Sequence, residues 1–391
     1  MIRLEDALEI IHNSSVNSLG CERLSLDLIT DRVLAEDVFT DTDFPSFDKS
    51  AMDGYAIRVE DIDKKLKLIE FIPAGTKPEN TVTSGSCSKI MTGAMVPEGA
   101  DMVVMQEDVT VVGDIISINN LKSRANILKQ GEDIKSGALL LKKGTVITPI
   151  HIGLLASVGM VNPLVFRLPK VSVISTGNEL VPPNEKPVSP QIRNSNSVQL
   201  VSLSDSIGAE TYNRGQVIDS KEAIFETVKD AMTKSDIVVL TGGASVGDYD
   251  FTAEVFEKLN AKIHFSRLAI QPGKPVLFAT VDNKYLFGLS GNPVSSYVQF
   301  QLLVKPLLKN LVEKYSETKI LRLPIGFDKT RKKAERMLFF PVKISENMEV
   351  EPLEYHGSAH LNSYQNADGM ASFPIGVNEL KKGTIIDVRP I

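Results

Sequence analysis

Apolar residues recur at helical spacing near the N-terminus of the chain. They fall on one face of residues 3–20, and Gly20 follows the last of them, so the pattern predicts a helix over this stretch. The residues of that face are Leu4, Ala7, Leu8, Ile11 and His12. Residues 66–148 instead contain short β-rich runs, such as LKLIEFI and DIISI, separated by Gly, Pro and Asn. This second pattern predicts a small β barrel or sandwich.

Strands and helices alternate from Lys170 onward. Apolar runs predict strands at VSVIS, TYNRGQVI and DIVVL, and later at AKIHFSRLAI, PVLFAT and KYLFGL. Helices are predicted from Asn194 to Ile207, from Asp219, from Asp250 to Leu259, and after Asn292. Asp219 precedes Glu222 by three residues, which is the spacing of a capping box with Asp219 as the first residue.

This alternation predicts an open, mostly parallel sheet with helices on both faces, which is a three-layer α/β domain. Residues 318–391 return to short strands with Pro and Gly turns and predict a small all-β domain. The expected fold class is therefore a multidomain α/β plus β protein.

Composition narrows the class of protein. The 391 residues suffice for two to four domains of roughly 100–200 residues each. A formal net charge of −6 argues against a nucleic-acid partner, because such binders usually carry a strongly basic face. No apolar run approaches the roughly 18 residues of a membrane span, and the acidic N-terminus does not look like a signal peptide. Two widely separated cysteines, Cys21 and Cys87, indicate a reducing compartment, so we expect a cytoplasmic protein without a membrane partner.

Three loops follow predicted strands of the α/β region: residues 175–179 (STGNE), 241–250 (TGGASVGDYD) and 288–295 (GLSGNPVS). Because the carboxyl ends of parallel strands meet at one edge of a sheet, we expect these loops to lie together. In the third loop Asn292 can cap the next helix and Pro293 fits its first turn, which would leave open amides suited to an anion. The alternative is a tight turn between strand and helix with nothing bound.

Acidic residues also follow the predicted strands. They are Glu179, Asp219, Asp248 and Asp250. Carboxylates repel a phosphate unless a divalent cation lies between them, and Mg²⁺ takes one or two carboxylates together with phosphate oxygens. The pattern therefore predicts a phosphate-bearing ligand bridged by Mg²⁺. The alternative is that each acid is a solvated helix cap.

Seven motifs stand in an order that characterises one family. They are FPSFDKSAMDGYAIR, KIMTGAMVPEGADMVVMQED, QGEDI, STGNEL, TGGASVGDYD, LAIQPGKP and GLSGNPVSS. In this order they resemble the motifs of molybdopterin molybdenumtransferases of the MoeA type, and the chain is also similar to the E domain of gephyrin. The resemblance covers nearly the whole chain.

The resemblance implies four regions. They are an elongated linker and dimer domain of residues 1–43 and 137–168, an inserted β domain of residues 44–136, a molybdopterin-binding α/β domain of residues 169–317, and a barrel-like C-terminal β domain of residues 318–391. It also implies a homodimer in which each active site lies in a cleft between protomers.

The resemblance further implies a reaction. Its substrates are adenylylated molybdopterin and molybdate, and its cofactor is Mg²⁺. The phosphoanhydride is cleaved, AMP leaves, and the pterin dithiolene binds molybdenum to form the molybdenum cofactor. Contacts with the molybdopterin adenylyltransferase are implied as well. Two alternatives remain, which are molybdopterin adenylylation itself and a non-catalytic molybdopterin-binding scaffold.

Site residues are carried over by motif. The implied catalytic residues are Asp53, Thr92, Asp133, Glu179, Asp219, Asp250 and Lys274, of which the first three would come from the β domain of the partner protomer. The implied substrate-binding residues are Gly242, Gly243, Ser245, Gly247, Asp248, Arg267, Gly291, Asn292, Pro293, Arg336 and Ser358. Asp219 and Asp250 are the implied metal ligands and the candidates for the general base.

This sequence departs from the family pattern at several positions. Arg267 and Gln271 stand where the family commonly has Lys, and Ser290 stands where it commonly has Pro. Gln271 removes one positive charge from a site that is expected to bind an oxyanion. The motif around Arg336 has Glu335 and Leu338 where Gly and an acid are usual.

Overall fold

The structure is a computed structural model that describes residues 1–15, 19–242, 251–312, 320–355 and 357–391. The chain forms two compact units. The first unit contains Met1–Ala35, Gly144–Ile147 and Leu164–Ile391, and the second contains Glu36–Lys143 and Thr148–Pro163. The finer division into four domains stays a prediction.

The second unit is built on a six-stranded sheet in the order β7-β4-β6-β5-β9-β8. Its strands are β4 (Gly54–Ile57), β5 (Lys65–Ile72), β6 (Ser86–Ile90), β7 (Met102–Met105), β8 (Val109–Val112) and β9 (Ile115–Ile118). Successive residues of a strand face opposite sides, so Tyr55 and Ile57 pack in one apolar cluster and Ala56 in another. The β-rich character predicted for this region is confirmed. The six strands form one sheet with an apolar cluster on each face, and among the described residues no pairing of β7 with β8 closes it into the predicted barrel.

Short elements complete the second unit. β2 (Val38–Phe39) pairs with β11 (Leu139–Leu141), and β3 (Lys49–Ser50) pairs with β10 (Ile127–Leu128). A single α-helix among the described residues of this unit, α2 (Pro149–Ser157), begins with Pro149, whose fixed φ suits the first turn.

The first unit contains a second six-stranded sheet, in the order β16-β13-β17-β21-β20-β18. Its strands are β13 (Lys170–Thr176), β16 (Glu210–Val217), β17 (Ile237–Thr241), β18 (Lys262–Arg267), β20 (Pro275–Val281) and β21 (Lys284–Leu289). β16, β13, β17 and β21 pair in parallel, whereas β20 runs antiparallel to both of its neighbours. Every residue of β17 is buried, as expected for a strand covered on both faces. The predicted mostly parallel sheet is confirmed.

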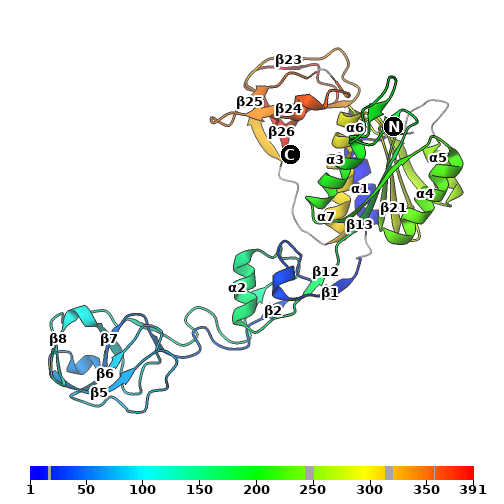
Figure 1. Ribbon diagram of the computed structural model, residues 1–391. Helices are drawn as coiled ribbons and strands as arrows, with labels where there is room; N and C mark the ends of the chain where they lie inside the picture. Colours follow the sequence, from blue (N-terminus) through cyan, green and yellow to red (C-terminus); the bar gives the residue numbers. More distant parts are fainter. Residues whose placement is uncertain (16–18, 243–250, 313–319, 356) are drawn as a thin grey trace. The chain divides into compact units, whose positions relative to one another are not determined.

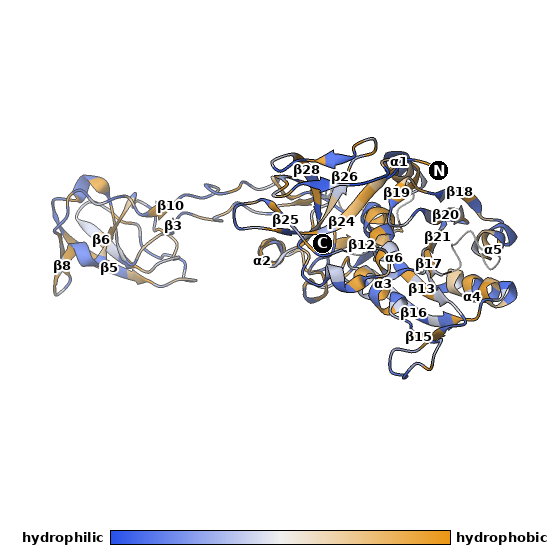
Figure 2. Cartoon of the chain, turned by 90° about the horizontal axis from the view of Figure 1, so that it is seen from above, coloured by the Kyte–Doolittle hydropathy of each residue, from blue (hydrophilic) through white to orange (hydrophobic). Residues whose placement is uncertain are grey.

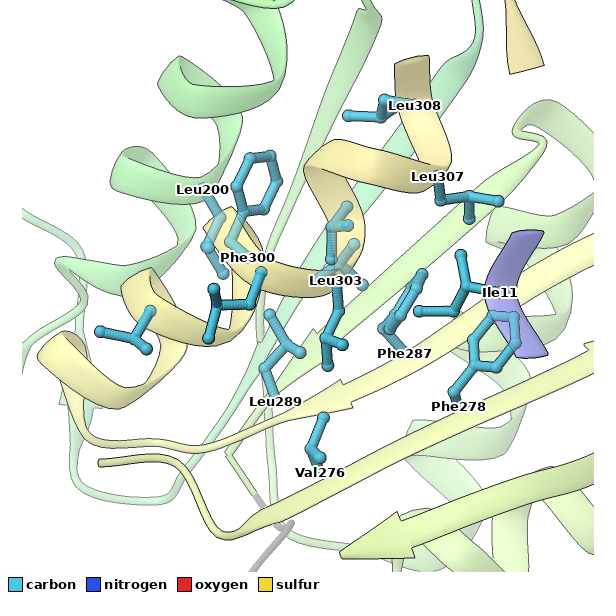
Figure 3. Packing of buried hydrophobic residues seen from close by; sticks show 14 of the residues in the cluster. Ile11, Leu200, Val276, Phe278, Phe287, Leu289, Phe300, Leu303, Leu307 and Leu308 are labelled. Atoms are coloured by element: carbon cyan, nitrogen blue, oxygen red, sulfur yellow. The ribbon is translucent and has the colours of Figure 1, made fainter. Parts of the chain in front are cut away.

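Helices cover both faces of this sheet, as predicted (Figure 1). α1 (Leu4–Ser14), α3 (Asn196–Asp205), α6 (Pro293–Gln299) and α7 (Lys305–Leu311) contribute to the apolar cluster on one face (Figure 3). α4 (Lys221–Lys234) and α5 (Thr252–Lys258) contribute to the cluster on the other face. Helices such as α3 and α4 carry both hydrophobic and hydrophilic residues (Figure 2), and it is the hydrophobic ones that pack on the sheet.

Phenylalanines form the centre of the first cluster. Phe278 and Phe287 are fully buried, and their ring centroids lie 4.9 Å apart in a tilted arrangement. Phe300 is buried in the same cluster (Figure 3). Full burial of each such side chain contributes about 1.5–3 kcal/mol, so this cluster holds the strand ends and the helices above them in place.

A π-helical segment, η4 (Phe300–Val304), joins α6 to α7. Pro306 lies just after it and has no N–H to give to the Leu302 carbonyl, which its ring would also crowd. The wider π-helical turn before the proline accommodates this conflict. The long helix predicted after Asn292 is therefore present, with a locally widened turn.

The C-terminal part forms a third large sheet, in the order β19-β24-β26-β28-β22 with β25 beside β24. Its strands are β19 (Ile270–Gln271), β22 (Leu321–Pro324), β24 (Met337–Ile344), β25 (Val350–Pro352), β26 (Gly369–Phe373) and β28 (Ile385–Pro390). Ile325 forms a bridge to Val350, and the Gly326 amide donates to the Val350 carbonyl at 2.8 Å. This bridge joins β22 to β25, so the strands close on themselves, and the predicted barrel-like domain is confirmed.

Three two-stranded pairs complete the first unit. They are β1 (Cys21–Arg23) with β12 (Leu164–Phe166), β14 (Leu180–Val181) with β15 (Ile192–Arg193), and β23 (Lys329–Thr330) with β27 (Glu379–Leu380).

Two predicted helix boundaries are wrong. α1 ends at Ser14 and not near Gly20, because the Ser14 and Ser15 hydroxyls donate to the carbonyls of Ile10 and His12, at 2.7 and 2.8 Å. α4 is capped by Ser220 and not by Asp219. The Ser220 Oγ accepts from the Ala223 amide at 3.4 Å. The Asp219 carboxylate is therefore not needed for the helix cap.

Candidate active site

The direction of the chain crossing reverses between β13 and β17. From β13 the chain passes through α3 to β16 on one side, and from β17 it passes through α5 to β18 at the opposite edge. In open α/β sheets a crevice forms beyond the carboxyl ends of the two strands at such a switch point, and ligands bind there. The last residues of these strands are Thr176 and Thr241.

A cavity of about 1250 Å³ opens at this point, larger than the roughly 300–1,000 Å³ typical of small-ligand sites. Strand ends, the segment 192–196, the loop 271–275 and part of the C-terminal barrel line it, and all belong to the first unit. The sequence-predicted residues that line it are Glu179, Asp219, Lys274, Gly242, Gly291, Asn292, Pro293, Arg336 and Ser358. The structure thus brings together residues that lie far apart along the chain.

Glycines let the strand-end loops approach one another beside the cavity. Gly242 has a φ of 95°, and a β-carbon there would lie 2.3 Å from the Thr176 carbonyl oxygen. A β-carbon on Gly291 would lie 3.5 Å from the Gly242 α-carbon. Only glycine at position 242 allows this packing. The Thr176 hydroxyl is buried here and has no hydrogen-bond partner among the described residues.

Two carboxylates line the cavity from the loops after neighbouring strands. Glu179 follows β13, and Asp219 follows β16. The backbone amide of Asn178 donates to Asp219 Oδ2 at 3.3 Å, and the Asp219 amide donates to Asn178 Oδ1 at 3.1 Å. The Glu179 carboxylate packs over Gly177, where a β-carbon would lie 2.6 Å from its Oε2. The hydrogen bonds to Asn178 orient Asp219, and the lack of a side chain on Gly177 leaves room for the Glu179 carboxylate, so both acids lie at the edge where the sequence predicts them.

Cationic side chains line the cavity from other elements. Lys274 lies between β19 and β20, and Arg336 precedes β24. Arg336 Nη1 donates to the Ile270 carbonyl at 3.4 Å. Arg331 Nη1 donates to the Arg336 carbonyl at 2.6 Å, which fixes the backbone at Arg336. Gln271 also lines the cavity. The site therefore lacks the positive charge of the lysine that the family commonly has at this position.

The loop before α6 is less open to an anion than the sequence predicts. Asn292 is the N-cap residue and Pro293 stands in the first turn, as predicted, but the Asn292 side chain makes no capping hydrogen bond. However, the Val294 amide donates to the Ser358 carbonyl at 3.1 Å, and the Asn292 amide donates to Ser290 Oγ at 3.3 Å. These contacts occupy two of the amides expected to face an anion, and they bring Ser358 to the start of the helix.

Several residues that line the cavity were not predicted from the sequence. Arg193 contributes a further cation from β15, which pairs in parallel with β14 directly after Glu179. Tyr355 lines the cavity from the C-terminal barrel, and burial raises its pKa to about 12, so its phenol stays neutral near pH 7 and can donate a hydrogen bond.

Two further missed residues are asparagines that join loops around the cavity. Asn196 Nδ2 donates to Thr241 Oγ1 at 3.1 Å and to the Gly291 carbonyl at 2.7 Å. Asn194 Oδ1 accepts from Ser175 Oγ at 3.1 Å, which ties the end of β13 to the start of α3. The available signal was the polar RNSN run before a helix, but such runs usually indicate only helix capping.

Arg267 is not among the residues that line the cavity, and its substrate-binding role stays a prediction. It ends β18 at the edge of the sheet, where the register places it opposite Pro275 and its carbonyl accepts from the Ile2 amide at 3.1 Å. Five other predicted residues, Gly243, Ser245, Gly247, Asp248 and Asp250, lie outside the described residues, so their roles stay predictions.

Three predicted site residues lie in the second unit. Asp53 Oδ1 accepts from the amide and the hydroxyl of Thr92, both at 2.7 Å, and these hydrogen bonds lower the pKa of Asp53 from its ordinary value. Asp133 is exposed, and its amide donates to the Phe44 carbonyl at 3.0 Å. The fold thus pairs Asp53 with Thr92, although the two belong to separate motifs.

Comparison with known proteins assigns these features to a class. Residues 2–159 match the family described as MoeA N-terminal region (domain I and II). Residues 172–310 match the family described as Probable molybdopterin binding domain, and residues 327–391 match MoeA C-terminal region (domain IV). The residues that line the cavity fall within the last two matches. Fold and site together define a protein of molybdenum cofactor biosynthesis.

Similar proteins narrow the class to one family. The molybdopterin molybdenumtransferase of Staphylococcus aureus strain COL is 34% identical over 398 residues, covering 99% of this chain and 95% of its own length. Its namesake in Staphylococcus epidermidis strain ATCC 12228 is 35% identical over 376 residues, covering 93% of this chain and 90% of its own length. Two structures of the molybdopterin biosynthesis protein MoeA from Pyrococcus horikoshii have TM-scores of 0.87 and 0.84 at 35% and 30% identity, and cover 100% of this chain and 99% and 100% of theirs.

The chain belongs to the molybdopterin molybdenumtransferase family, which is a family of transferases. In the described part of the chain, no helix combines the length and apolar character needed to cross a membrane.

Proposed function

We propose that this protein inserts molybdenum into adenylylated molybdopterin, with release of AMP, to form the molybdenum cofactor. The observation that supports this proposal is the cavity at the switch point, which combines carboxylates after two strands with cations from other loops. Adenylylated molybdopterin carries phosphates and reacts with a second oxyanion, molybdate. A site for both needs cations for the oxyanions and carboxylates for a bridging metal ion. The cavity volume of about 1250 Å³ suits a pterin joined to a nucleotide.

Lys274, Arg336 and Ser358 are the proposed oxyanion-binding residues. The two cations would attract molybdate and balance the negative charge that accumulates on the phosphoanhydride oxygens during cleavage. Ser358 would add a hydroxyl donor at the start of α6, where its own carbonyl is already held by the Val294 amide. Arg193, whose register partner is Val181, also lines the cavity and would supply a further cation for the phosphates.

The residues present fit Mg²⁺ bound together with phosphate. Among the described residues, no three histidine, cysteine or acidic side chains are grouped closely enough to hold a metal by themselves. Mg²⁺ needs only one or two carboxylates when phosphate oxygens complete its shell, and Glu179 and Asp219 both line the cavity. Bound there, the ion would neutralise the phosphoanhydride and polarise it toward cleavage.

A carboxylate would orient the attacking water as general base. Asp219 suits this role because the Asn178 amide holds its Oδ2 and so fixes the orientation of the group. Asp250 is the second candidate and lies outside the described residues. AMP would then leave, and the pterin dithiolene would be available to molybdate at the cationic part of the cavity.

The test is AMP release by the purified protein given adenylylated molybdopterin and Mg²⁺, with and without molybdate. We expect molybdate-dependent release that falls at least about tenfold in Lys274→Gln, because a charge contact is lost. Lys262→Gln, which changes an exposed lysine of β18 outside the cavity, is the matched control.

Two results would contradict the proposal. Consumption of ATP with formation of the adenylylated pterin would show that the protein is an adenylyltransferase instead. Tight pterin binding by the folded protein without any AMP release would indicate a scaffold.

We also propose that the active form is a homodimer in which Asp53, Thr92 and Asp133 of one copy act on the ligand held by the other. The shared contact of Asp53 and Thr92 supports their common role. The same proposal includes a cytoplasmic location and a transient contact with the molybdopterin adenylyltransferase, which would deliver a reactive intermediate directly.

A further inference from the structure

Gln299 is a buried polar residue that connects two of the loops around the cavity. It is the last residue of α6, and none of its surface is exposed. Its Nε2 donates to the carbonyls of Gly273 and Pro275, at 2.9 and 2.6 Å. Its Oε1 accepts from the Ser290 amide at 2.8 Å. One side chain therefore joins the loop of residues 273–275 to the loop before α6.

The chemistry of these partners fixes the orientation of the Gln299 amide. Two carbonyl oxygens can accept only from an NH₂ group, and a backbone N–H requires an oxygen. A glutamate of the same shape would lack the donors while ionised. A leucine would remove the hydrogen bonds to three backbone groups, and the contacts to Gly273 and Ser290 are buried. The position is thus specific for a neutral amide.

Lys274 lies between the two carbonyls that Gln299 holds. A β-carbon on Gly273 would lie 2.9 Å from Gln299 Cγ, so the side chain also packs directly against this loop. The Lys274 carbonyl accepts from the Leu268 amide at 2.9 Å. The backbone of Lys274 is therefore fixed on both sides, while its side chain lines the cavity.

The backbone of Ser290 is also held by hydrogen bonds, one of them to Gln299. Its amide reaches Gln299, its carbonyl accepts from Thr241 Oγ1 at 2.9 Å, and its Oγ accepts from the Asn292 amide. A proline at position 290 could not make the first of these hydrogen bonds. Ser290, which stands where the family commonly has Pro, therefore has a backbone N–H that Gln299 Oε1 accepts from.

We propose that Gln299 is a positioning residue, which fixes the backbone on both sides of Lys274 so that its ammonium group meets the oxyanion in the cavity. The effect on oxyanion binding rests on the proposed function, whereas the effect on loop order does not. Both can be measured on the full chain.

Three variants separate the contributions. Gln299→Leu removes all three hydrogen bonds. Gln299→Glu keeps the shape and loses the donors, but a buried carboxyl beside two carbonyls has a raised pKa, and its protonated form regains one donor. Gln301→Leu is the matched control, because Gln301 is two residues further along the helix and bonds to Tyr297 and Lys305 instead.

The first readout is hydrogen exchange of the Leu268 amide, which donates to the Lys274 carbonyl and so reports on the order of this loop. Relative to the wild type at the same pH, we expect faster exchange in Gln299→Leu throughout. In Gln299→Glu we expect faster exchange at neutral pH and a return toward the wild-type rate in acid, and in Gln301→Leu we expect the wild-type rate. Unchanged exchange in Gln299→Leu would overturn the inference, whatever the activity of the wild type.

The second readout is molybdate affinity by equilibrium dialysis, in a cycle with Lys274→Gln. We expect Gln299→Leu to weaken binding about tenfold. The double variant should be no weaker than Lys274→Gln alone, because both changes act through one contact. Additive losses, or a loss in Gln299→Leu with none in Lys274→Gln, would overturn the inference. Altered exchange together with a wild type that releases no AMP would support the positioning and count against the proposed function alone.

Discussion

Gly242 is held between two other loops and tolerates no side chain. We predict that Gly242→Ala lowers the free energy of unfolding by at least about 2 kcal/mol, because the new β-carbon would lie 2.3 Å from the Thr176 carbonyl oxygen at a φ of 95°. Urea unfolding of the purified variant measures the change.

Gly215→Ala is the matched control for Gly242→Ala. Gly215 lies in the same sheet with a φ of 74°, but a β-carbon there would meet nothing within 4 Å. This control carries the conformational cost without the steric clash. Equal losses in the two variants would contradict a special role for the close approach at Gly242.

Asp53 accepts two hydrogen bonds from Thr92, and both favour the ionised carboxylate. We predict that Thr92→Val raises the pKa of Asp53 toward its ordinary value, while the remaining amide contact keeps it lowered in part. An NMR titration of the Asp53 carboxyl carbon measures this shift. The control is Thr110→Val, since Thr110 bonds to Asn119 and not to an acid.

The sign of the pH effect follows from the lowered pKa of Asp53. The folded state binds fewer protons than the unfolded state, so the contact stabilises the second unit fully above the unfolded pKa of about 3.9. That contribution is lost as the pH falls through the lower, folded pKa. An identical Asp53 titration in Thr92→Val and wild type would show that the hydroxyl contributes nothing.

Asp219 and Ser220 are adjacent at the start of α4 but have different roles, since Ser220 caps the helix and Asp219 lines the cavity. We predict that Ser220→Ala lowers stability by about 1 kcal/mol through loss of the cap and leaves AMP release per folded molecule unchanged. Asp219→Asn should do the reverse, with stability within about 0.5 kcal/mol of wild type and at least about tenfold slower AMP release. Urea unfolding and the AMP assay on both variants provide the comparison. If Asp219→Asn instead lost the stability, Asp219 would be the cap after all.

The elements that carry the site could largely be predicted from the sequence. Buried parallel strands such as β17 leave uninterrupted apolar runs, and polar loops directly after them must gather at one edge. That reasoning located Glu179, Asp219 and Lys274. The motifs, read through the family, added Arg336 and Ser358 from a separate sheet.

Other site residues left no local signal. Gln299 is the last residue of α6, and its partner Gly273 lies 26 residues away, so only the packed structure relates them. Arg193 reaches the cavity because β15 pairs with β14. Each of these strands has two residues, which is too short to show a pattern in the sequence. The place of Arg267 opposite Pro275 likewise depends on strand register.

For the whole molecule we predict complementation between inactive variants. Asp53→Asn and Lys274→Gln should each abolish most AMP release, but mixing and reassociating them should restore about one quarter of wild-type activity, because a statistical mixture of dimers contains that share of intact sites. Analytical ultracentrifugation establishes the dimer beforehand.

The control mixture combines Asp53→Asn with Asp133→Asn, which change the same part of the site and should not complement. Full inactivity of the Asp53→Asn and Lys274→Gln mixture would mean that each copy builds its site alone.

The pairing of β19 with β24 has a consequence for how such a gene can change. β19 precedes β20 in the chain, yet it is the edge strand of the C-terminal sheet, and the Met337 amide donates to the Ala269 carbonyl at 2.8 Å. On its other side the Ile2 amide donates to the Arg267 carbonyl. Segments from the beginning, middle and end of the gene therefore meet along one short stretch of backbone. Recombination that exchanged any one of these segments with that of a diverged relative would disturb the backbone of residues 267–271, which leads to Lys274. We therefore expect the three segments to be inherited together.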